Sequence, residues 1–178
     1  VGEMFLKVLE EKKLNIDNYV LLASSRSKGK KVKFMNKDYV VEELTEHSFD
    51  NNRFQYALFS AGASTAEKYA KIAAQNGCIV IDNSSCFRMD KSVPLVVPQV
   101  NMEDAYEHFN IISNPNCSTI QAVVPLKVLD DKYKLKRVIY STYQAVSGAG
   151  KKGIDDLENN TTTKFPCLLL IVTVKVLL

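Results

Sequence analysis

The chain has 178 residues, enough for one full domain and part of a second. Hydrophobic residues make up 46% of it and charged residues 24%, which is ordinary for a globular protein and excludes the disordered and collagen-like classes. The net charge is only +3, and the basic stretch KGKKVK from Lys28 to Lys33 is short, so we expect no nucleic-acid partner.

Cysteine usage predicts a cytoplasmic protein without a metal site. The four cysteines form no CxxC pair, and only His47 and His108 could join them as zinc ligands. Neither a zinc site nor a disulfide framework is therefore expected, which fits a reducing compartment. We expect no signal peptide. We also expect no membrane partner, because the apolar stretch CLLLIVTVKVLL is too short to span a bilayer and carries Lys175.

The N-terminal region predicts a helix followed by short strands. The pattern EMFLKVLEEKK is typical of a helix whose apolar side chains face inward, here Phe5, Leu6 and Leu9. The run YVLLAS from Tyr19 is typical of a short buried strand. Runs rich in β-formers flank Asn36-Lys37, so we expect a hairpin that turns there.

The middle of the chain predicts a βαβ unit. We expect a strand at Tyr56–Ala61, a helix at Ser64–Gly77 that its terminal glycine caps, and a strand at Cys78–Ser84. Further strands are expected at Asn110–Ser113 and Arg137–Val146. This alternation predicts the α/β class, with a parallel sheet.

Cys117 stands where a turn meets a predicted amphipathic helix. Asn114-Pro115-Asn116 ends the strand before it, and apolar residues recur at helical spacing from Ile120 onward. A helix N-terminus favours a thiolate over a thiol through the helix dipole and the unpaired backbone N–H groups, as a nucleophile requires. The alternative is that Cys117 is a small buried hydrophobe, and its position alone does not decide between the two.

Five separated motifs stand out along the chain: LLASSRSKGK, LFSAGAST, IDNSSCFRMDKSVPLVVPQVN, SNPNCSTIQ and STYQAVSGAGKKGIDDL. In their order, spacing and residues they resemble the aspartate-β-semialdehyde dehydrogenase family, over roughly Val1 to Pro166. The resemblance implies NADPH-dependent reduction of L-aspartyl-4-phosphate to L-aspartate-4-semialdehyde with release of phosphate. That reaction belongs to lysine (diaminopimelate), methionine and threonine biosynthesis.

The resemblance also implies roles for residues of the catalytic motifs. Cys117 would attack the acyl phosphate and form a thioester, and Asn116 would orient the substrate carbonyl. Arg88 and Asn83 would bind the phosphate, because a guanidinium fork fits a phosphate dianion. Gln144 would contact the substrate.

Two of these assignments have structural alternatives. Arg88 could instead form a surface ion pair with Asp90. Gln144 could be a polar residue that is merely exposed at the end of a strand.

Cofactor choice is implied by the residues after the strand that starts at Tyr19. Proteins of this type that prefer NAD carry an acidic residue there, whereas this chain has Ser24, Arg26 and Ser27, which suit the 2′-phosphate of NADP. Small residues would let the dinucleotide approach the backbone or would serve a turn only; they are Ser60, Gly62 and Ser64. The loop beside the nicotinamide would contain Ser147 and Gly148.

Parts of the family pattern are not found in the sequence. Gly2 alone remains of the glycine-rich turn, and the strand expected before it is missing. The family's histidine base has no counterpart, since His47 and His108 are expected to be exposed. After Pro166 the sequence no longer resembles the family's motifs, which a shifted reading frame, a truncated gene or a divergent strand would explain. We therefore expect this chain to be inactive on its own.

We expect two domains. Residues 1–116 would form a Rossmann-type NADP-binding domain, and residues 117–178 the truncated start of an α+β catalytic and dimerisation domain, atypical over 167–178. The full-length protein would be a homodimer or homotetramer with small-molecule substrates. Two alternatives stay open: a non-catalytic remnant, and N-acetyl-γ-glutamyl-phosphate reductase.

Overall fold

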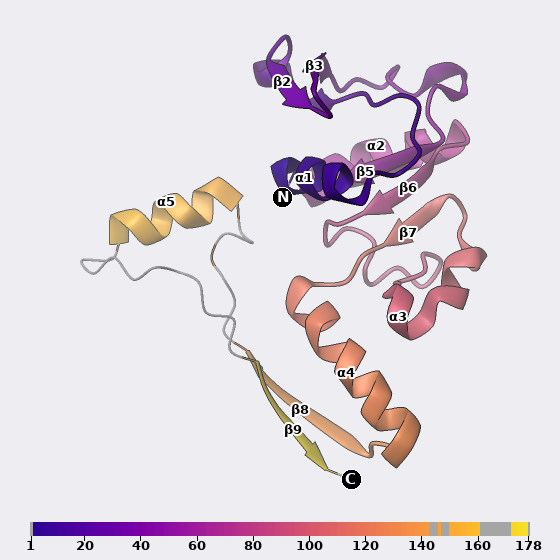
Figure 1. The fold of residues 1–178 in the computed structure, drawn as a ribbon, viewed down its shortest axis with the longest axis vertical. Helices are drawn as coiled ribbons and strands as arrows, with labels where there is room; N and C mark the ends of the chain where they lie inside the picture. The colour runs from indigo at the N-terminus through magenta and orange to yellow at the C-terminus, as the bar shows by residue number, and fades with distance from the viewer. Residues whose placement is uncertain (1, 143–145, 147–149, 161–171, 178) are drawn as a thin grey trace. The chain divides into compact units, whose positions relative to one another are not determined.

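The computed structural model describes residues 2–142, 146, 150–160 and 172–177, drawn in colour in Figure 1. The chain forms two compact units. One contains Val1–Val96 and Asn101–Pro115, and the other contains Val97–Val100 and Asn116–Leu178. Helices alternate with strands in both, which confirms the predicted α/β class.

A three-stranded parallel sheet organises the first unit. Its strands are β5 (Tyr56–Phe59), β6 (Ile79–Asp82) and β7 (Ile111–Ser113), in the order β5-β6-β7. Helix α2 (Ala63–Gln75) connects β5 to β6 and completes the predicted βαβ unit. Both β5 and β6 end two residues earlier than expected, at Phe59 and Asp82.

The core of the first unit lies between α2 and one face of this sheet. Three small residues of α2, Ala66, Ala70 and Ala73, are buried one helical turn apart and let the helix approach the strands closely. Phe59 of β5 and Val80 of β6 are buried on the face of the sheet that α2 covers. Their neighbours along the strands, Leu58 and Ile81, point to the opposite face and are exposed. The period-two alternation of β-strands therefore separates a packed face from an open one.

The helix before these strands forms as expected but is less buried than expected. Helix α1 spans Gly2–Lys12 and has no fully buried residue, and the side chains predicted to face inward are only half-buried. The strand predicted from Tyr19 shortens to β1 (Leu22–Ala23), which pairs in parallel with β4 (Glu42–Glu43).

The predicted hairpin is present, but its turn lies one residue earlier than expected. Strands β2 (Lys31–Phe34) and β3 (Lys37–Val40) pair antiparallel, with Phe34 opposite Lys37. The turn residues are thus Met35 and Asn36, whose φ angles are 51° and 57°. Two consecutive positive φ angles match the twist of the flanking strands in a two-residue hairpin, which is why Asn36 occupies the turn centre.

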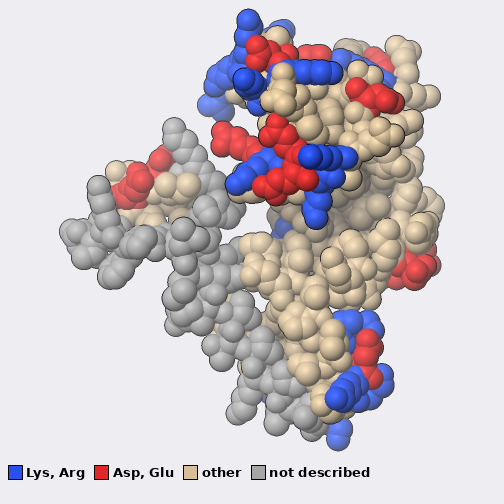
Figure 2. All heavy atoms as spheres, in the orientation of Figure 1, with Lys and Arg blue, Asp and Glu red and all other residues tan. Residues whose placement is uncertain are grey.

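Charges of both signs lie over this hairpin. Figure 2 shows Lys and Arg side chains interspersed with Asp and Glu near β2 and β3. Lys28 forms an ion pair with Glu43 at 3.1 Å, and Arg53 forms one with Glu42 at 3.0 Å. The basic stretch therefore does not make a face of one sign.

The first unit also contains three short helices, η1 (Ser25–Ser27), η2 (Asp50–Asn52) and η3 (Met102–Glu107). Helix α3 (Pro98–Asn101) belongs to the second unit except for its last residue. Gly77 follows α2 with a φ of 74°, in the left-handed conformation typical of a glycine after a helix C-cap. Its predicted capping role is confirmed.

Besides most of α3, the described part of the second unit contains helices α4 and α5 and an antiparallel strand pair. Helix α4 spans Cys117–Tyr133, β8 spans Arg137–Thr142, α5 spans Gly150–Asn160 and β9 spans Val172–Leu177. β8 and β9 pair over their whole length, so this part of the atypical tail forms a strand. The predicted strand from Arg137 ends at Thr142, before residues 143–145, which lie outside the described residues.

The amphipathic character predicted for α4 is wrong. Its only fully buried residues are Ser118 and Ala122, and the apolar Val128 and Leu129 are exposed. Pro125 lies inside the helix, where its missing N–H removes one intrahelical hydrogen bond.

The packing of α2 predicts a size limit at Ala70, which is 0% exposed. Ala70→Leu should lower the free energy of unfolding by about 1–3 kcal/mol, because extra methylene groups cannot be accommodated between helix and sheet. The neighbouring Lys71→Leu, on the exposed face, is the matched control and should change it by less than about 0.5 kcal/mol. Urea denaturation measures both, and equal effects would contradict the packing described.

Candidate active site

The carboxyl ends of β5, β6 and β7 lie at one edge of the sheet. Their last residues, Phe59, Asp82 and Ser113, are cross-strand partners. The ladder continues one step further, since the Asn83 N–H donates to the Phe59 carbonyl at 2.9 Å and the Asn114 N–H to the Asp82 carbonyl at 2.8 Å. Ligands of open parallel sheets bind outside this edge, so Asn83 and Asn114 stand at the expected place.

A buried carboxylate fixes the loop after β6. Asp82 is 0% exposed, and its two carboxylate oxygens accept hydrogen bonds from the Ser84 N–H at 2.9 Å and the Ser84 hydroxyl at 2.7 Å. The Ser84 Oγ in turn accepts from the Cys86 N–H at 3.1 Å. The loop therefore turns back on itself before it reaches Arg88.

Arg88 links this loop to the loop after β7. Its Nε donates to the Asn114 carbonyl at 3.0 Å, and its Nη2 donates to the Asn83 carbonyl at 3.1 Å. Within the described residues it forms no ion pair with Asp90, whose carboxylate accepts instead from the N–H and hydroxyl of Ser92. These two bonds lower the pKa of Asp90, the side-chain bond most strongly. The surface ion pair considered for Arg88 is therefore wrong.

Asn114 is a site residue that the sequence motifs did not single out. Its side-chain Nδ2 donates to the Asn83 Oδ1 at 2.6 Å, across the ends of β6 and β7. The only sequence signal was its place in the Asn-Pro-Asn turn directly after a strand.

Cys117 is the first residue of α4 and is exposed, as a nucleophile at a helix N-terminus requires. Asn116 is the N-cap, and its Oδ1 accepts from the Ser118 N–H at 2.9 Å. The Cys117 Sγ lies 4.0 Å from the same oxygen. The predicted helix start is confirmed, and the alternative of a small buried hydrophobe is wrong for Cys117.

The other described cysteines have different surroundings. Cys78 is buried in the core, and burial raises its pKa to about 11. Burial also raises the pKa of the partly buried Cys86, and the negative charges of Asp82 and Glu67 add to this effect. Both thiols therefore remain protonated near neutral pH.

The residues predicted to select the cofactor lie directly after β1. Ser24 precedes η1, which contains Arg26 and Ser27, and no acidic residue follows the strand. Arg26 is exposed and forms no ion pair in the part of the chain that the structure describes, where Glu43 pairs with Lys28. An exposed cation between hydroxyl groups is thus available to an anionic ligand.

The small residues after β5 form a tight turn into α2. Gly62 has a φ of 96°, which a residue with a side chain rarely adopts, so the turn itself requires glycine. A Cβ at Gly62 would meet no atom within 4 Å, so the backbone there is also open to a ligand. Ser60 is half-buried and Ser64 is exposed in the first turn of α2.

Four predicted site residues remain, and only one of them lies among the residues that the structure describes. Gly2 is exposed at the start of α1. Gln144, Ser147 and Gly148 lie outside the described residues.

The two histidines differ in exposure. His47 is exposed, as expected, and its Nδ1 lies 3.0 Å from Asp50 Oδ2. His108 is half-buried rather than exposed, and its Nδ1 accepts from the Asn110 N–H at 2.9 Å.

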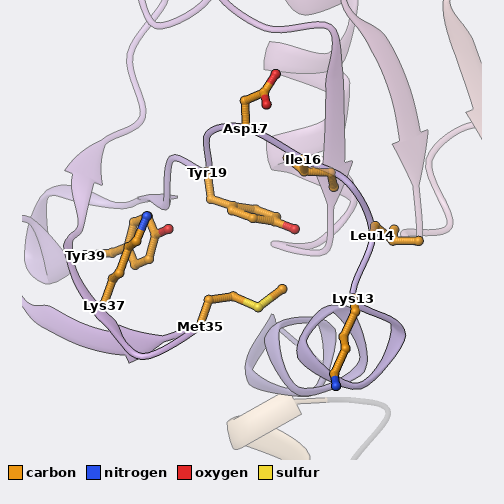
Figure 3. A pocket seen from close by; sticks show the side chains of 8 residues that line it. All are labelled: Lys13, Leu14, Ile16, Asp17, Tyr19, Met35, Lys37 and Tyr39. Atoms are coloured by element: carbon orange, nitrogen blue, oxygen red, sulfur yellow. The ribbon is translucent and has the colours of Figure 1, made fainter.

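A pocket of about 280 Å³ lies elsewhere in the first unit, between the end of α1 and the hairpin. Figure 3 shows the side chains that line it. Tyr19, Met35 and Tyr39 line it, and none of the predicted site residues does. Among the described residues, no cluster of His, Cys, Asp and Glu could hold a metal ion. None of the described helices has the length and apolar character needed to cross a membrane.

Two family profiles match the chain. The profile "Semialdehyde dehydrogenase, NAD binding domain" matches residues 1–108, and "Semialdehyde dehydrogenase, dimerisation domain" matches residues 126–174. The second match continues beyond Pro166, where the recognisable motifs end.

Two similar proteins are both named aspartate-semialdehyde dehydrogenase. The chain is 56% identical to the aspartate-semialdehyde dehydrogenase of Aquifex aeolicus over 90% of its length and 48% of the relative's. It is 54% identical to that of Campylobacter jejuni, over 88% of this chain and 46% of the relative. The chain thus spans about half the length of these relatives.

Solved structures agree in fold. Aspartate semialdehyde dehydrogenase II of Vibrio cholerae, complexed with ASA, matches with a TM-score of 0.82 and 48% identity, over 90% of this chain and 48% of that one. The Candida albicans enzyme with NADP matches with a TM-score of 0.69 and 30% identity, over 89% and 51%. With an NAD-binding domain, the start of a dimerisation domain and these relatives, the chain belongs to the aspartate-semialdehyde dehydrogenase family.

Proposed function

We propose that the chain supplies the nucleotide-binding part and the nucleophile of an enzyme that reduces L-aspartyl-4-phosphate with NADPH. The products are L-aspartate-4-semialdehyde, NADP⁺ and phosphate. The observation that carries the proposal is an exposed cysteine at the first residue of a helix, in a chain of this family. The neighbours solved with ASA and with NADP support the substrate class and the cofactor.

Cys117 performs the covalent step. Its thiolate attacks the acyl carbon, the bond from that carbon to the phosphate oxygen breaks, and phosphate leaves with the electron pair, so that a thioester remains. Backbone N–H groups at the start of α4 stabilise the oxyanion that forms on the way, and Asn116 orients the carbonyl. NADPH, when bound, would supply a hydride to the thioester carbon. The bond from that carbon to Cys117 Sγ then breaks, the aldehyde leaves, and the Cys117 thiolate is regenerated.

The leaving phosphate binds at the carboxyl edge of the β5-β6-β7 sheet. Arg88 and Asn83 contact it there. Gln144 contacts the rest of the substrate, a role that the resemblance to the family implies. Arg88 already donates two N–H groups to backbone carbonyls, which leaves the two on Nη1 and one on Nη2 for phosphate oxygens. A guanidinium fixed in this way binds an anion with little further loss of side-chain entropy.

NADP is the preferred cofactor in this proposal. The turn after β1 fits its 2′-phosphate, because Arg26 is exposed between Ser24 and Ser27 and no carboxylate stands where NAD-preferring proteins have one. The small residues that permit close approach of the dinucleotide are Gly2, Ser60, Gly62, Ser64, Ser147 and Gly148.

The domain division follows from these roles. Residues 1–116 form the NADP-binding domain and residues 117–178 begin the catalytic and dimerisation domain. The full-length protein assembles as a homodimer or homotetramer in the cytoplasm and serves lysine, methionine and threonine biosynthesis.

The reaction is tested in reverse on the full-length protein. We expect phosphate-dependent reduction of NADP⁺ with L-aspartate-4-semialdehyde, followed by the absorbance of NADPH. N-acetyl-L-glutamate-5-semialdehyde is the control substrate, since activity with it instead would establish N-acetyl-γ-glutamyl-phosphate reductase. No activity with either aldehyde would favour a non-catalytic remnant.

Cysteine labelling tests the nucleophile. Iodoacetamide at pH 7.5 should modify Cys117 first and abolish activity, because Cys117 is exposed while burial keeps Cys78 and Cys86 protonated. Mass spectrometry of peptides from the labelled protein identifies the site. Cys86→Ser is the matched control and should label and lose activity as the wild type does. Activity that disappears with modification of Cys86, while Cys117 is still unmodified, would refute the assignment.

Cofactor preference is tested at Arg26. Arg26→Ala should raise the KM for NADPH about tenfold or more, since a charged hydrogen bond to the 2′-phosphate is lost, and should leave the KM for NADH nearly unchanged. Arg137→Ala removes another exposed arginine and should affect neither value. Equal losses with both cofactors would show that Arg26 does not read the 2′-phosphate.

A further inference from the structure

We infer that Asn114 is a positioning residue that fixes the side-chain amide of Asn83 with its Nδ2 group toward the ligand. In this orientation the carboxyl edge of the sheet offers hydrogen-bond donors to an anion. The inference rests on the proposed phosphate site, and it adds a residue to that site and the atom of Asn83 that binds.

Three of the hydrogen-bonding groups of Asn83 are already occupied. Its N–H donates to the Phe59 carbonyl at 2.9 Å, and its carbonyl accepts from Arg88 Nη2 at 3.1 Å. Its Oδ1 accepts from Asn114 Nδ2 at 2.6 Å. Among the described residues nothing accepts from the Asn83 Nδ2, so two N–H donors remain for a ligand.

The backbone of Asn114 is held in place from two sides. Its N–H donates to the Asp82 carbonyl at 2.8 Å, and its carbonyl accepts from Arg88 Nε at 3.0 Å. With the backbones of both asparagines fixed, the Asn83 side-chain amide can still adopt two orientations, which differ by a half turn. The hydrogen bond from Asn114 favours the direction with Oδ1 turned toward Asn114.

That choice matters for an anionic ligand. With Nδ2 outward, Asn83 adds two donors to those left on Arg88, and phosphate oxygens accept from all of them. With Oδ1 outward, an acceptor would face the phosphate oxygens and repel them. Asn114 therefore acts on phosphate affinity through Asn83 rather than by contact.

Proton NMR of side-chain amides tests the orientation directly in the wild-type chain. Titration with inorganic phosphate should shift the ¹H and ¹⁵N signals of the Asn83 NH₂ group and move those of the Asn114 NH₂ group much less. Spectra of Asn83→Ala and Asn114→Ala assign the two groups. Larger shifts at Asn114 than at Asn83 would reverse the assignment and overturn the inference.

A double-mutant cycle tests whether Asn114 acts through Asn83. Calorimetric titration with phosphate should show that Asn114→Ala weakens binding about tenfold in the wild-type background, since a donor to a charged group is no longer held in place. In the Asn83→Ala background the same change should weaken it less than about twofold. Asn18→Ala, at an exposed asparagine away from the strand ends, is the control and should leave affinity unchanged.

The outcomes separate the inference from the proposed function. A wild-type chain that binds phosphate while the two substitutions act additively would overturn the role of Asn114 and leave the phosphate site standing. A wild-type chain that does not bind phosphate would overturn both. If Asn114→Ala does not fold, Asn114→Asp assigns the Asn114 NH₂ signals instead, and the titration of the wild type still decides.

Discussion

In-register parallel pairing of β5, β6 and β7 is the constraint on which the candidate phosphate site depends. It brings Phe59, Asp82 and Ser113 to the same edge of the sheet, and the ladder extends one residue further on two of the strands. A slip of one residue would turn each side chain of a strand to the opposite face. The buried row of alanines on α2 keeps the sheet in this register by packing against one face only.

The loops beyond that edge are held by hydrogen bonds rather than by apolar packing. Asp82 carries a buried carboxylate whose oxygens are both satisfied by Ser84, so its burial is tolerated. Arg88 then joins the loops after β6 and β7 by donating to a backbone carbonyl in each. A charged side chain that ties two loops together is also held in a fixed orientation, which is what its proposed role in phosphate binding requires.

Position in the fold sets the chemistry of the cysteines. Cys78 lies in the core, where burial raises its pKa to about 11 and makes it part of the packing. Partial burial raises the pKa of Cys86, and the negative charges of Asp82 and Glu67 add to this effect. Cys117 stands exposed at the start of α4, beside the N-cap Asn116. The three side chains are chemically identical, and their surroundings leave one suited to nucleophilic attack.

Local patterns in the sequence determined the strands of the βαβ unit, the glycine after α2 and the start of α4 at Cys117, because periodicity and capping act between near neighbours. They did not determine the partners of Arg88 and Asn114. These bonds join residues 26 and 31 positions apart, so they exist only once β6 and β7 pair. The burial of α4 was missed for the same reason, since helical spacing shows which residues share a face, while only the tertiary structure decides what covers that face.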